Sequence, residues 1–299
     1  LGVETFGVHG VDMQGYEDLL IEALKCHPHI VIDDGGDLID LLGGKCGEYA
    51  DCLLGGCEET TTGIHRLYAR ERAGILPCPM MAVNDAKAKH YYDNKYGTGQ
   101  STWDAIMHTT NLMVAGKTVV VAGYGWCGKG IAMRAKGMGA NVIVTEVDPF
   151  KALEATMENF RVMPMDEAAR YGDIFVTATG CKDVIVERHF QVMKHNVLLC
   201  NSGHFDCEVD VARLGQLVCG LSGHGGVALD DPGGHRLVPG PAGVLDELPA
   251  VGLRHVGGVL DRLVVGEGED LRLGSAGVQN GLGPGGDGTG GEGHMGPAA

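Results

Sequence analysis

The chain has 299 residues, enough for two domains, and its 44% hydrophobic and 21% charged residues are typical of a soluble globular protein. Its formal net charge of −16 argues against nucleic acid and anionic membrane surfaces as partners. The ten cysteines form neither a C-x-x-C pair nor a cluster with histidine at zinc spacing, so we predict no metal site. No apolar run is long enough to span a membrane and no signal peptide is recognisable, which favours a cytoplasmic protein with reduced thiols.

The first predicted elements are a helix and a strand. Apolar residues at helical spacing predict an amphipathic helix over 16–26, and 29–32 reads as a short strand. Acids and a glycine pair, in the stretch Asp33–Asp37, follow at the carboxyl end of that strand, where α/β proteins bind ligands. A solvated acidic turn would have the same sequence, so the stretch by itself leaves both interpretations open.

The stretch Glu58–Gly63 reads Glu-Glu-Thr-Thr-Thr-Gly and precedes a predicted helix through Ile64 and Leu67. One threonine of the run can cap that helix. Capping needs only one of the three, however, and three hydroxyls beside two carboxylates can also bind polyol or amide groups.

A strand is predicted over 80–83 and a helix over 84–94. Lys89 and Asp93 are four residues apart and therefore share one face of that helix. They can form an exposed ion pair, or a lysine that takes a proton beside an aspartate that also holds a substrate; the pair alone does not decide. A further helix over 101–115, with Gly116 as its C-terminal cap, is predicted to bridge two domains.

The centre of the chain carries a dinucleotide-binding pattern. An apolar strand over 119–122 is followed by a helix and, between the two, by glycines at G-x-G-x-x-G spacing, namely Gly123, Gly125 and Gly128. The next strand ends in Glu146, 21 residues after Gly125. A carboxylate at that distance binds the ribose diol and repels a 2′-phosphate, so the pattern predicts NAD rather than NADP. The alternative is a glycine-rich turn in an ordinary α/β domain, with Glu146 on its surface.

Strands and helices then alternate up to a strand at 197–200, with Asn201 and His204 just past its carboxyl end. This alternation predicts an α/β fold built on a Rossmann-type doubly wound parallel sheet. A loop histidine is more often structural, but the Asn-x-Gly-His-Phe-Asp context of His204 favours a functional role.

The last third of the chain has a different composition. Residues 220–299 contain 24 of the 50 glycines and no Lys, Ile, Phe, Tyr or Trp. We therefore expect no recognisable fold over 213–299. One hypothesis is a frameshifted translation of GC-rich DNA, which a clean open reading frame on resequencing would exclude; the other is a natural low-complexity, disordered segment.

Taken together, the motifs of residues 10–212 resemble adenosylhomocysteinase, also called S-adenosyl-L-homocysteine hydrolase. The motifs that carry the resemblance are Asp33-Asp-Gly-Gly-Asp37, Glu58-Glu-Thr-Thr-Thr-Gly63, Asn84-Asp85 with Lys89 and Asp93-Asn94, Gly123–Gly130, Thr145-Glu-Val-Asp-Pro149, Met163-Pro-Met-Asp-Glu167 and Asn201-Ser-Gly-His-Phe-Asp206. The resemblance implies a permanently held NAD that oxidises the substrate 3′-hydroxyl to a ketone. Homocysteine is then eliminated, water adds and the ketone is reduced, so that the net reaction is reversible hydrolysis to adenosine and L-homocysteine.

The resemblance also implies roles for individual residues. Lys89 and Asp93 engage the 3′-hydroxyl, Glu59 holds the ribose diol, and Asp34 and His204 transfer protons near the 4′ and 5′ carbons. The implied NAD contacts, besides the glycines, are Thr60, Thr61, Thr62, Asn94 and Asn201, with Glu146 and Lys151 at the adenosine ribose. Lys151 stands where many relatives have asparagine; it could reach the same hydroxyls or tolerate a phosphate.

By the same resemblance, residues 1–94 are part of a substrate-binding domain that is incomplete at its N-terminus, 95–212 are the NAD-binding domain, and the protein is a homo-oligomer, as a tetramer. Because closure over the substrate needs both halves of the substrate domain, we expect little or no activity from this chain. Two other functions stay open. An NAD-dependent 2-hydroxy acid dehydrogenase would leave Glu58–Thr62 unexplained, and a non-catalytic NAD-binding relative would act by pairing with a full subunit.

Overall fold

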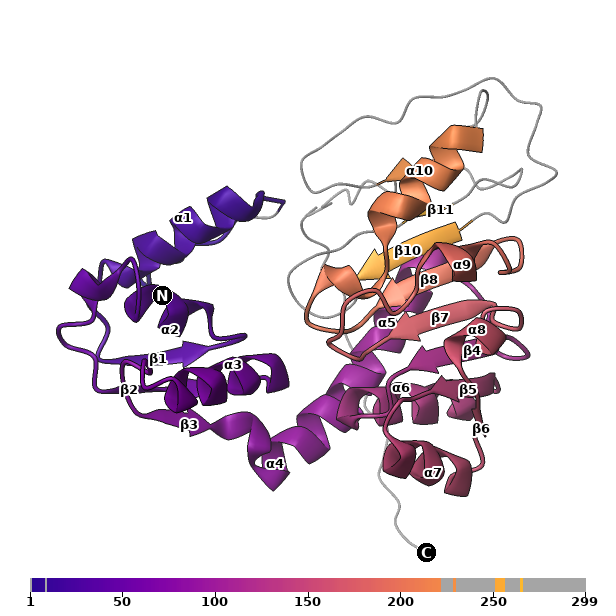
Figure 1. Ribbon diagram of the computed structural model, residues 1–299, viewed down its shortest axis with the longest axis horizontal. Coiled ribbons are helices and arrows are strands. Elements are labelled where there is room, and N and C mark those ends of the chain that lie inside the picture. The colour runs from indigo at the N-terminus through magenta and orange to yellow at the C-terminus, as the bar shows by residue number, and fades with distance from the viewer. Residues whose placement is uncertain (1, 9, 222–227, 230–250, 256–263, 266–299) are drawn as a thin grey trace, which may run out of the picture. The chain divides into compact units, whose positions relative to one another are not determined.

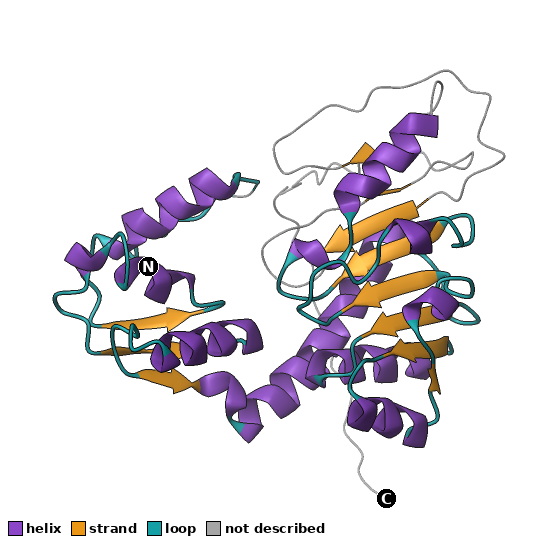
Figure 2. Ribbon diagram, in the orientation of Figure 1, coloured by secondary structure: helices purple, strands orange, loops and turns teal. Residues whose placement is uncertain are grey.

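The computed structural model describes residues 2–8, 10–221, 228–229, 251–255 and 264–265 (Figure 1). The strands form a three-stranded sheet in the order β1-β2-β3 and a six-stranded sheet in the order β10-β8-β7-β4-β5-β6 (Figure 2). A separate pair consists of β11 (Val264–Val265) and β9 (Ala228–Leu229). All neighbours in the first two sheets are parallel. Parallel strands place all their carboxyl ends at one edge of a sheet, which is where polar site residues are expected.

The first sheet is covered by helices on one face. Its strands are β1 (Ile30–Asp33), β2 (Gly55–Glu58) and β3 (Met80–Ala82), and its helices are α1 (Met13–Leu24), α2 (Asp37–Leu42), η1 (Gly47–Tyr49) and α3 (Thr61–Arg72). Val31 packs with residues of all three α-helices, among them Leu24, Ile39 and Leu67. On the other face Ile32 stays 78% exposed. The predicted first helix and strand are confirmed, with the helix starting three residues earlier.

Between the two sheets, the structure differs from the predicted helices. Residues 83–97 form three short pieces, η2 (Val83–Asp85), α4 (Lys87–Lys89) and the π-helix η3 (His90–Gly97), and not one helix over 84–94. Helix α5 (Thr98–Thr110) also ends earlier than predicted. Asn111 takes a left-handed conformation with φ of 51° and donates its N–H to Met107, so it is the cap that we had assigned to Gly116.

The second sheet is doubly wound, as predicted. Its strands are β4 (Thr118–Ala122), β5 (Asn141–Thr145), β6 (Arg161–Val162), β7 (Ile174–Thr177), β8 (Val197–Asn201) and β10 (Val251–His255). Val119 and Val121 pack on one face with α5, α6 (Trp126–Gly137) and α7 (Pro149–Met157). Val120 packs on the other with α8 (Met165–Ala168), α9 (Glu187–Phe190) and α10 (Val211–Leu221) (Figure 1). Residues pointing to both faces are buried, which explains the continuous apolar runs in these strands.

Part of the segment from which we expected no fold is ordered. Helix α10 continues to Leu221, and β10 pairs in parallel with β8. The expectation for 213–299 is therefore wrong for 213–221, where Leu214 and Leu217 extend the core cluster on one face of the second sheet. Most of 222–299 lies outside the described residues, and the two hypotheses about the origin of this segment concern those residues.

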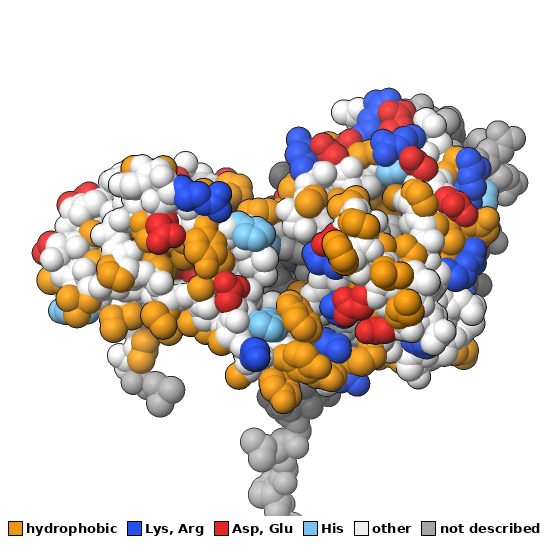
Figure 3. Space-filling view, turned by 60° about the horizontal axis from the view of Figure 1, so that its bottom comes forward, with side chains coloured by type: hydrophobic (Ala, Val, Ile, Leu, Met, Phe, Trp, Pro, Cys, Tyr) orange, Lys and Arg blue, Asp and Glu red, His pale blue; other side chains and the backbone are white. Residues whose placement is uncertain are grey.

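Within the described part of the chain, no helix is both long and apolar enough to cross a membrane. On the face drawn in Figure 3, acidic, basic and apolar side chains are interspersed, and the described residues of that face form no continuous basic patch.

Candidate functional site

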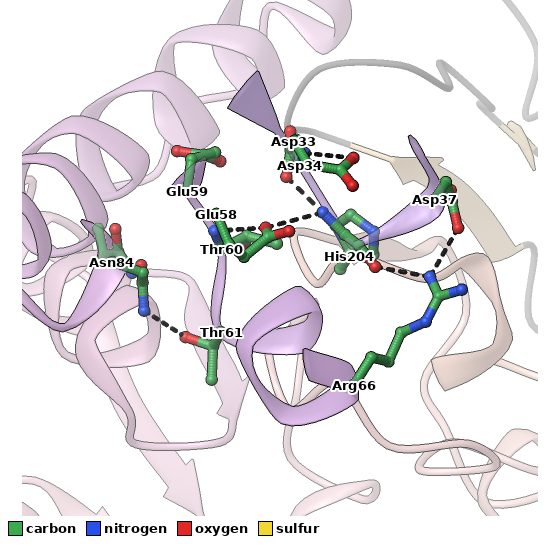
Figure 4. Close-up of polar contacts among 12 residues, drawn as sticks. Asp33, Asp34, Asp37, Glu58, Glu59, Thr60, Thr61, Arg66, Asn84 and His204 are labelled. Carbon is green, nitrogen blue, oxygen red and sulfur yellow. Dashed lines mark hydrogen bonds and ion pairs between the residues drawn. The ribbon is translucent and has the colours of Figure 1, made fainter. Parts of the chain in front are cut away.

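Asp33, the last residue of β1, and Asp34, which follows it, have different surroundings (Figure 4). Asp33 is 3% exposed, and its carboxylate accepts the N–H groups of Leu38 at 3.3 Å and Ile39 at 3.0 Å at the start of α2. It therefore caps that helix. Asp34 is exposed at the surface and faces Glu59. Asp34 is nevertheless partly buried, and this partial burial and the neighbouring charge of Glu59 raise the pKa of Asp34. His204 acts in the opposite direction and lowers the pKa.

Glu58 fixes the start of α3. Its side chain is fully buried, and its Oε1 accepts the N–H groups of Gly35 at 2.9 Å and Thr60 at 3.0 Å (Figure 4). Thr60 is the N-cap residue, but its side chain makes no capping bond. The predicted threonine cap is thus not formed by the side chain of Thr60, and the Glu58 carboxylate instead binds the backbone N–H of this residue. This contact also holds the backbone beside Asp34 and beside Glu59.

Gly63→Ala should destabilise the first sheet and its helices. A Cβ at this position would lie 2.1 Å from the Glu58 carboxyl carbon, and the carboxyl cannot move without leaving two N–H groups unpaired. We expect a loss of about 1–3 kcal/mol of unfolding free energy, although alanine favours helices over glycine by about 1 kcal/mol. Urea unfolding measures it. Gly47→Ala is the control, since its Cβ would meet only the Leu42 carbonyl, at 3.7 Å.

Glu58 should also give the stability a recognisable pH dependence. Burial raises its pKa above the ordinary 4.5, although the N–H groups of Gly35 and Thr60 act against it. A carboxyl that binds protons more tightly when folded stabilises fully below its ordinary pKa, and that contribution is lost as the pH rises through the raised value. The unfolding free energy of the parent minus that of Glu58→Gln should therefore fall as the pH increases above 4.5. A difference that stays flat with pH would contradict this.

Lys89 lies at the centre of a polar cluster. Its Nζ is 3.0 Å from Glu59 Oε2, 3.0 Å from Asp93 Oδ2, 3.1 Å from Asn84 Oδ1 and 2.7 Å from Asn94 Oδ1. The Lys89 side chain is only 15% exposed, so this is not the exposed ion pair that the spacing allowed. Burial lowers the pKa of Lys89, but Glu59 and Asp93 outweigh it, and the net shift is upward.

Asn84 is a member of this cluster to which the sequence analysis gave no role. It is 4% exposed, accepts from Asn94 Nδ2 at 2.9 Å and donates to Thr61 Oγ1 at 3.0 Å. The available signal was its position directly past β3, at the same sheet edge as the carboxyl ends of β1 and β2. Thr62, also on α3, is half-buried. From the threonine run, Thr61 joins the Lys89 cluster through its hydrogen bond with Asn84.

His204 comes from the loop after β8. Its Nδ1 is 4.0 Å from Asp34 Oδ1, so the structure brings together the two residues that we expected to transfer protons. Asn201, expected at the NAD, is 3% exposed and holds this loop. Its Oδ1 accepts the Gly203 N–H at 2.9 Å, and its Nδ2 donates to the Phe205 carbonyl at 2.6 Å, on either side of His204.

The glycine motif has the geometry that a dinucleotide requires. Gly123 has φ of +94°, and a Cβ on Gly128 would lie 1.9 Å from the Gly123 carbonyl oxygen, so the turn and the helix contact require glycine. Gly125 differs, because its Cβ would meet no protein atom within 4 Å. It is the N-cap of α6 and has no side chain to cap the free N–H groups there. These groups fit a pyrophosphate.

Glu146 is held in place at the end of β5. Its Oε2 accepts the Tyr124 N–H at 2.7 Å, and its Oε1 accepts those of Val147 at 2.8 Å and Asp148 at 3.0 Å. These contacts fix an anion beside the glycine turn, as the ribose-binding role requires. Lys151 is nearby on α7, with its Nζ 3.9 Å from Asp148 Oδ2 and about half of its side chain exposed.

Comparisons with known proteins agree with this geometry. Residues 94–221 match the family model described as S-adenosyl-L-homocysteine hydrolase, NAD binding domain. The chain is 54% identical over 213 residues to an adenosylhomocysteinase of Archaeoglobus fulgidus, covering 71% of this chain and 53% of that protein. It is 56% identical over 216 residues to an S-inosyl-L-homocysteine hydrolase of Methanocaldococcus jannaschii, covering 72% and 52%.

A third relative is an adenosylhomocysteinase of Pyrococcus abyssi, 52% identical over 221 residues, covering 74% of this chain and 52% of that protein. The chain thus spans about half the length of these curated relatives. Its Rossmann-type domain uses NAD as its cofactor. With the matched domain and these identities, the chain belongs to the adenosylhomocysteinase family.

Proposed function

We propose that this protein catalyses the NAD-dependent, reversible hydrolysis of S-adenosyl-L-homocysteine to adenosine and L-homocysteine through a 3′-keto intermediate. The observation that carries the proposal is the cluster around Lys89. Its ammonium group, two carboxylates and two amides lie at the carboxyl edge of a parallel sheet. Such a set can bind a vicinal diol and move a proton from one of its hydroxyls.

Bound NAD supplies the oxidation and later reduction of the 3′ carbon. The chain's own residues do the rest. Glu59 accepts hydrogen bonds from the ribose diol, and Lys89 and Asp93 hold the 3′-hydroxyl. Asp34 and His204 serve the proton transfers near the 4′ and 5′ carbons. Thr60, Thr61, Thr62, Asn94 and Asn201 contact the NAD, and Glu146 and Lys151 lie at its adenosine ribose.

The pKa of Lys89 constrains how it acts. With both carboxylates within 3.0 Å, Lys89 is held as an ammonium ion and cannot accept a proton. If the ribose diol takes over the carboxylate of Glu59, one of these stabilising contacts is lost while burial continues to lower the pKa. Substrate binding would therefore reduce the upward shift of the Lys89 pKa, because one of the two contacts that raise it is shared with the diol.

Release of adenosine from adenosylhomocysteine by a complete version of this enzyme, without added NAD, tests the proposal against its alternatives. A hydrolase with retained NAD gives adenosine. A 2-hydroxy acid dehydrogenase needs external NAD and accumulates NADH, and a non-catalytic NAD-binding partner does neither. S-inosyl-L-homocysteine is assayed in parallel, because a relative of similar identity bears that substrate in its name. Turnover of the inosyl compound alone would overturn the adenosyl assignment.

We also propose that the protein acts in the cytoplasm as a homo-oligomer, with a tetramer as the expected state. The family resemblance supports the oligomer, and the cysteine usage supports a reducing compartment. Light scattering of the purified protein measures the assembly.

A further inference from the structure

A buried glutamate in the NAD-binding domain has no part in the mechanism so far. Glu208 is fully buried in η4 (Asp206–Glu208), four residues after His204. Its two carboxylate oxygens point at the loop that follows β7. Oε2 accepts the N–H of Thr179 at 2.9 Å and its hydroxyl at 2.6 Å, and Oε1 accepts the Gly180 N–H at 2.9 Å.

The same residue is joined to that loop through its backbone. The Glu208 carbonyl accepts the N–H groups of Val184 at 2.8 Å and Ile185 at 3.0 Å. The loop after β7 is therefore fastened to the loop after β8 at both the side chain and the main chain. Two neighbouring strands of the sheet thus have their exit loops joined at the carboxyl edge.

Each of the two joined loops leads to a part of the site. The β8 loop carries His204, and within it a Cβ on Gly203 would lie 1.6 Å from Glu208 Oε1, so the loop closes tightly over the carboxylate. The β7 loop packs against the glycine turn that follows β4. The Ala178 N–H bonds to the Ala122 carbonyl at 2.8 Å, and a Cβ on Gly123 would lie 2.8 Å from the Ala178 carbonyl oxygen.

We propose that Glu208 is a positioning residue that sets the His204 loop and the NAD-contacting glycine turn at a fixed distance from each other. The need for a carboxylate follows from the donor count. Each carboxylate oxygen accepts a backbone N–H, from Thr179 or from Gly180, so either orientation of a glutamine amide would place its NH₂ against an N–H group. The role of His204 rests on the proposed function, whereas the contact with the glycine turn does not.

The test compares Glu208→Gln with Asp173→Asn in the full 299-residue chain. Asp173 is the matched control, because its carboxylate also bonds a neighbouring strand, at the Thr118 N–H (2.7 Å), but at the opposite edge of the same sheet. Calorimetry measures NAD affinity, thermal unfolding measures stability, and the NMR signal of the His204 ring, assigned with His204→Gln, reports its surroundings.

We expect Glu208→Gln to weaken NAD binding about tenfold and to shift or broaden the His204 signal, as loss of a charge-assisted hydrogen bond implies. Asp173→Asn should lower the unfolding temperature with neither effect. Unchanged NAD affinity and His204 signal in Glu208→Gln would overturn the proposal, and so would equal changes in the control. If Glu208→Gln does not fold, Thr179→Val removes the hydroxyl that donates to Glu208 and accepts the Cys181 N–H, and leaves the two backbone N–H bonds to the carboxylate in place. It should change NAD affinity and the His204 signal in the same direction by less; no change there also overturns the proposal. Adenosine release is measured separately, in a complete version of the enzyme, so its absence would count against the proposed function alone.

Discussion

In a complete version of this enzyme, Lys89→Ala is expected to lose oxidation of the substrate 3′-hydroxyl by about 10² or more while it keeps its NAD. The reason is the concentration of contacts on one nitrogen: Nζ meets Glu59 and Asp93 at 3.0 Å each. Without the lysine, no group in the cluster both orients the hydroxyl and takes its proton. Asp93→Ala should show the same loss, because the aspartate holds the ammonium group in place.

The measurement is the rapid reduction of bound NAD when adenosylhomocysteine is mixed with the enzyme. Lys95→Ala is a matched control on the π-helix that carries Asp93, since the Lys95 Nζ lies over the rings of Tyr91 and Tyr96. We expect a normal burst from this control. A normal burst from Lys89→Ala or Asp93→Ala would refute the assignment of both residues.

Three alanine substitutions in the glycine turn and its helix should separate folding from NAD binding. Gly128→Ala places a methyl group 1.9 Å from a backbone oxygen that cannot rotate away, so we expect a loss of about 3 kcal/mol of stability or more. Gly125→Ala meets no protein atom, yet its methyl group enters the space beside the free N–H groups of α6. It should fold normally and bind NAD weaker by a factor on the order of 10².

Gly137→Ala, at the end of the same helix and also without a neighbour, should do neither. Thermal unfolding and calorimetry with NAD decide. Tight NAD binding by a well-folded Gly125→Ala would show that the pyrophosphate does not approach this turn.

The sequence predicts those features that depend on neighbouring residues. The strand, glycine turn and acid from Val119 to Glu146 follow one another along the chain, and the spacing of Lys89 and Asp93 was sufficient to place them together. The contact that fixes the backbone before α3 was missed because it comes from Glu58, whose carboxylate binds Thr60 and also Gly35 on another loop. No local pattern distinguishes that contact from the threonine cap that the composition suggests.

Other differences arose because two signals competed. Asn111 and Gly116 can each end a helix, and the tertiary structure selects the first. The end of the folded domain was placed too early, at residue 212, because glycine enrichment outweighed a short amphipathic segment that packs Leu214 and Leu217 against the sheet. Asn84 was assigned no role because its bond to Thr61 depends on the parallel pairing of β2 with β3, which no spacing along the chain shows.

The contacts around Lys89 depend on the number of residues in the segment that leads into the π-helix at residues 90–97. In an α-helix, a residue five positions on is turned away by about 140°, whereas π geometry stacks positions five apart. Lys89 accordingly contacts both its fourth and its fifth successor, Asp93 and Asn94. Removing one residue from this segment, with every polar side chain retained, would rotate Asn94 out of reach. The geometry of the site thus depends on the length of this segment as well as on its side chains. A relative that lacks one residue here would keep every polar side chain of the cluster and still lose the contact between Lys89 and Asn94.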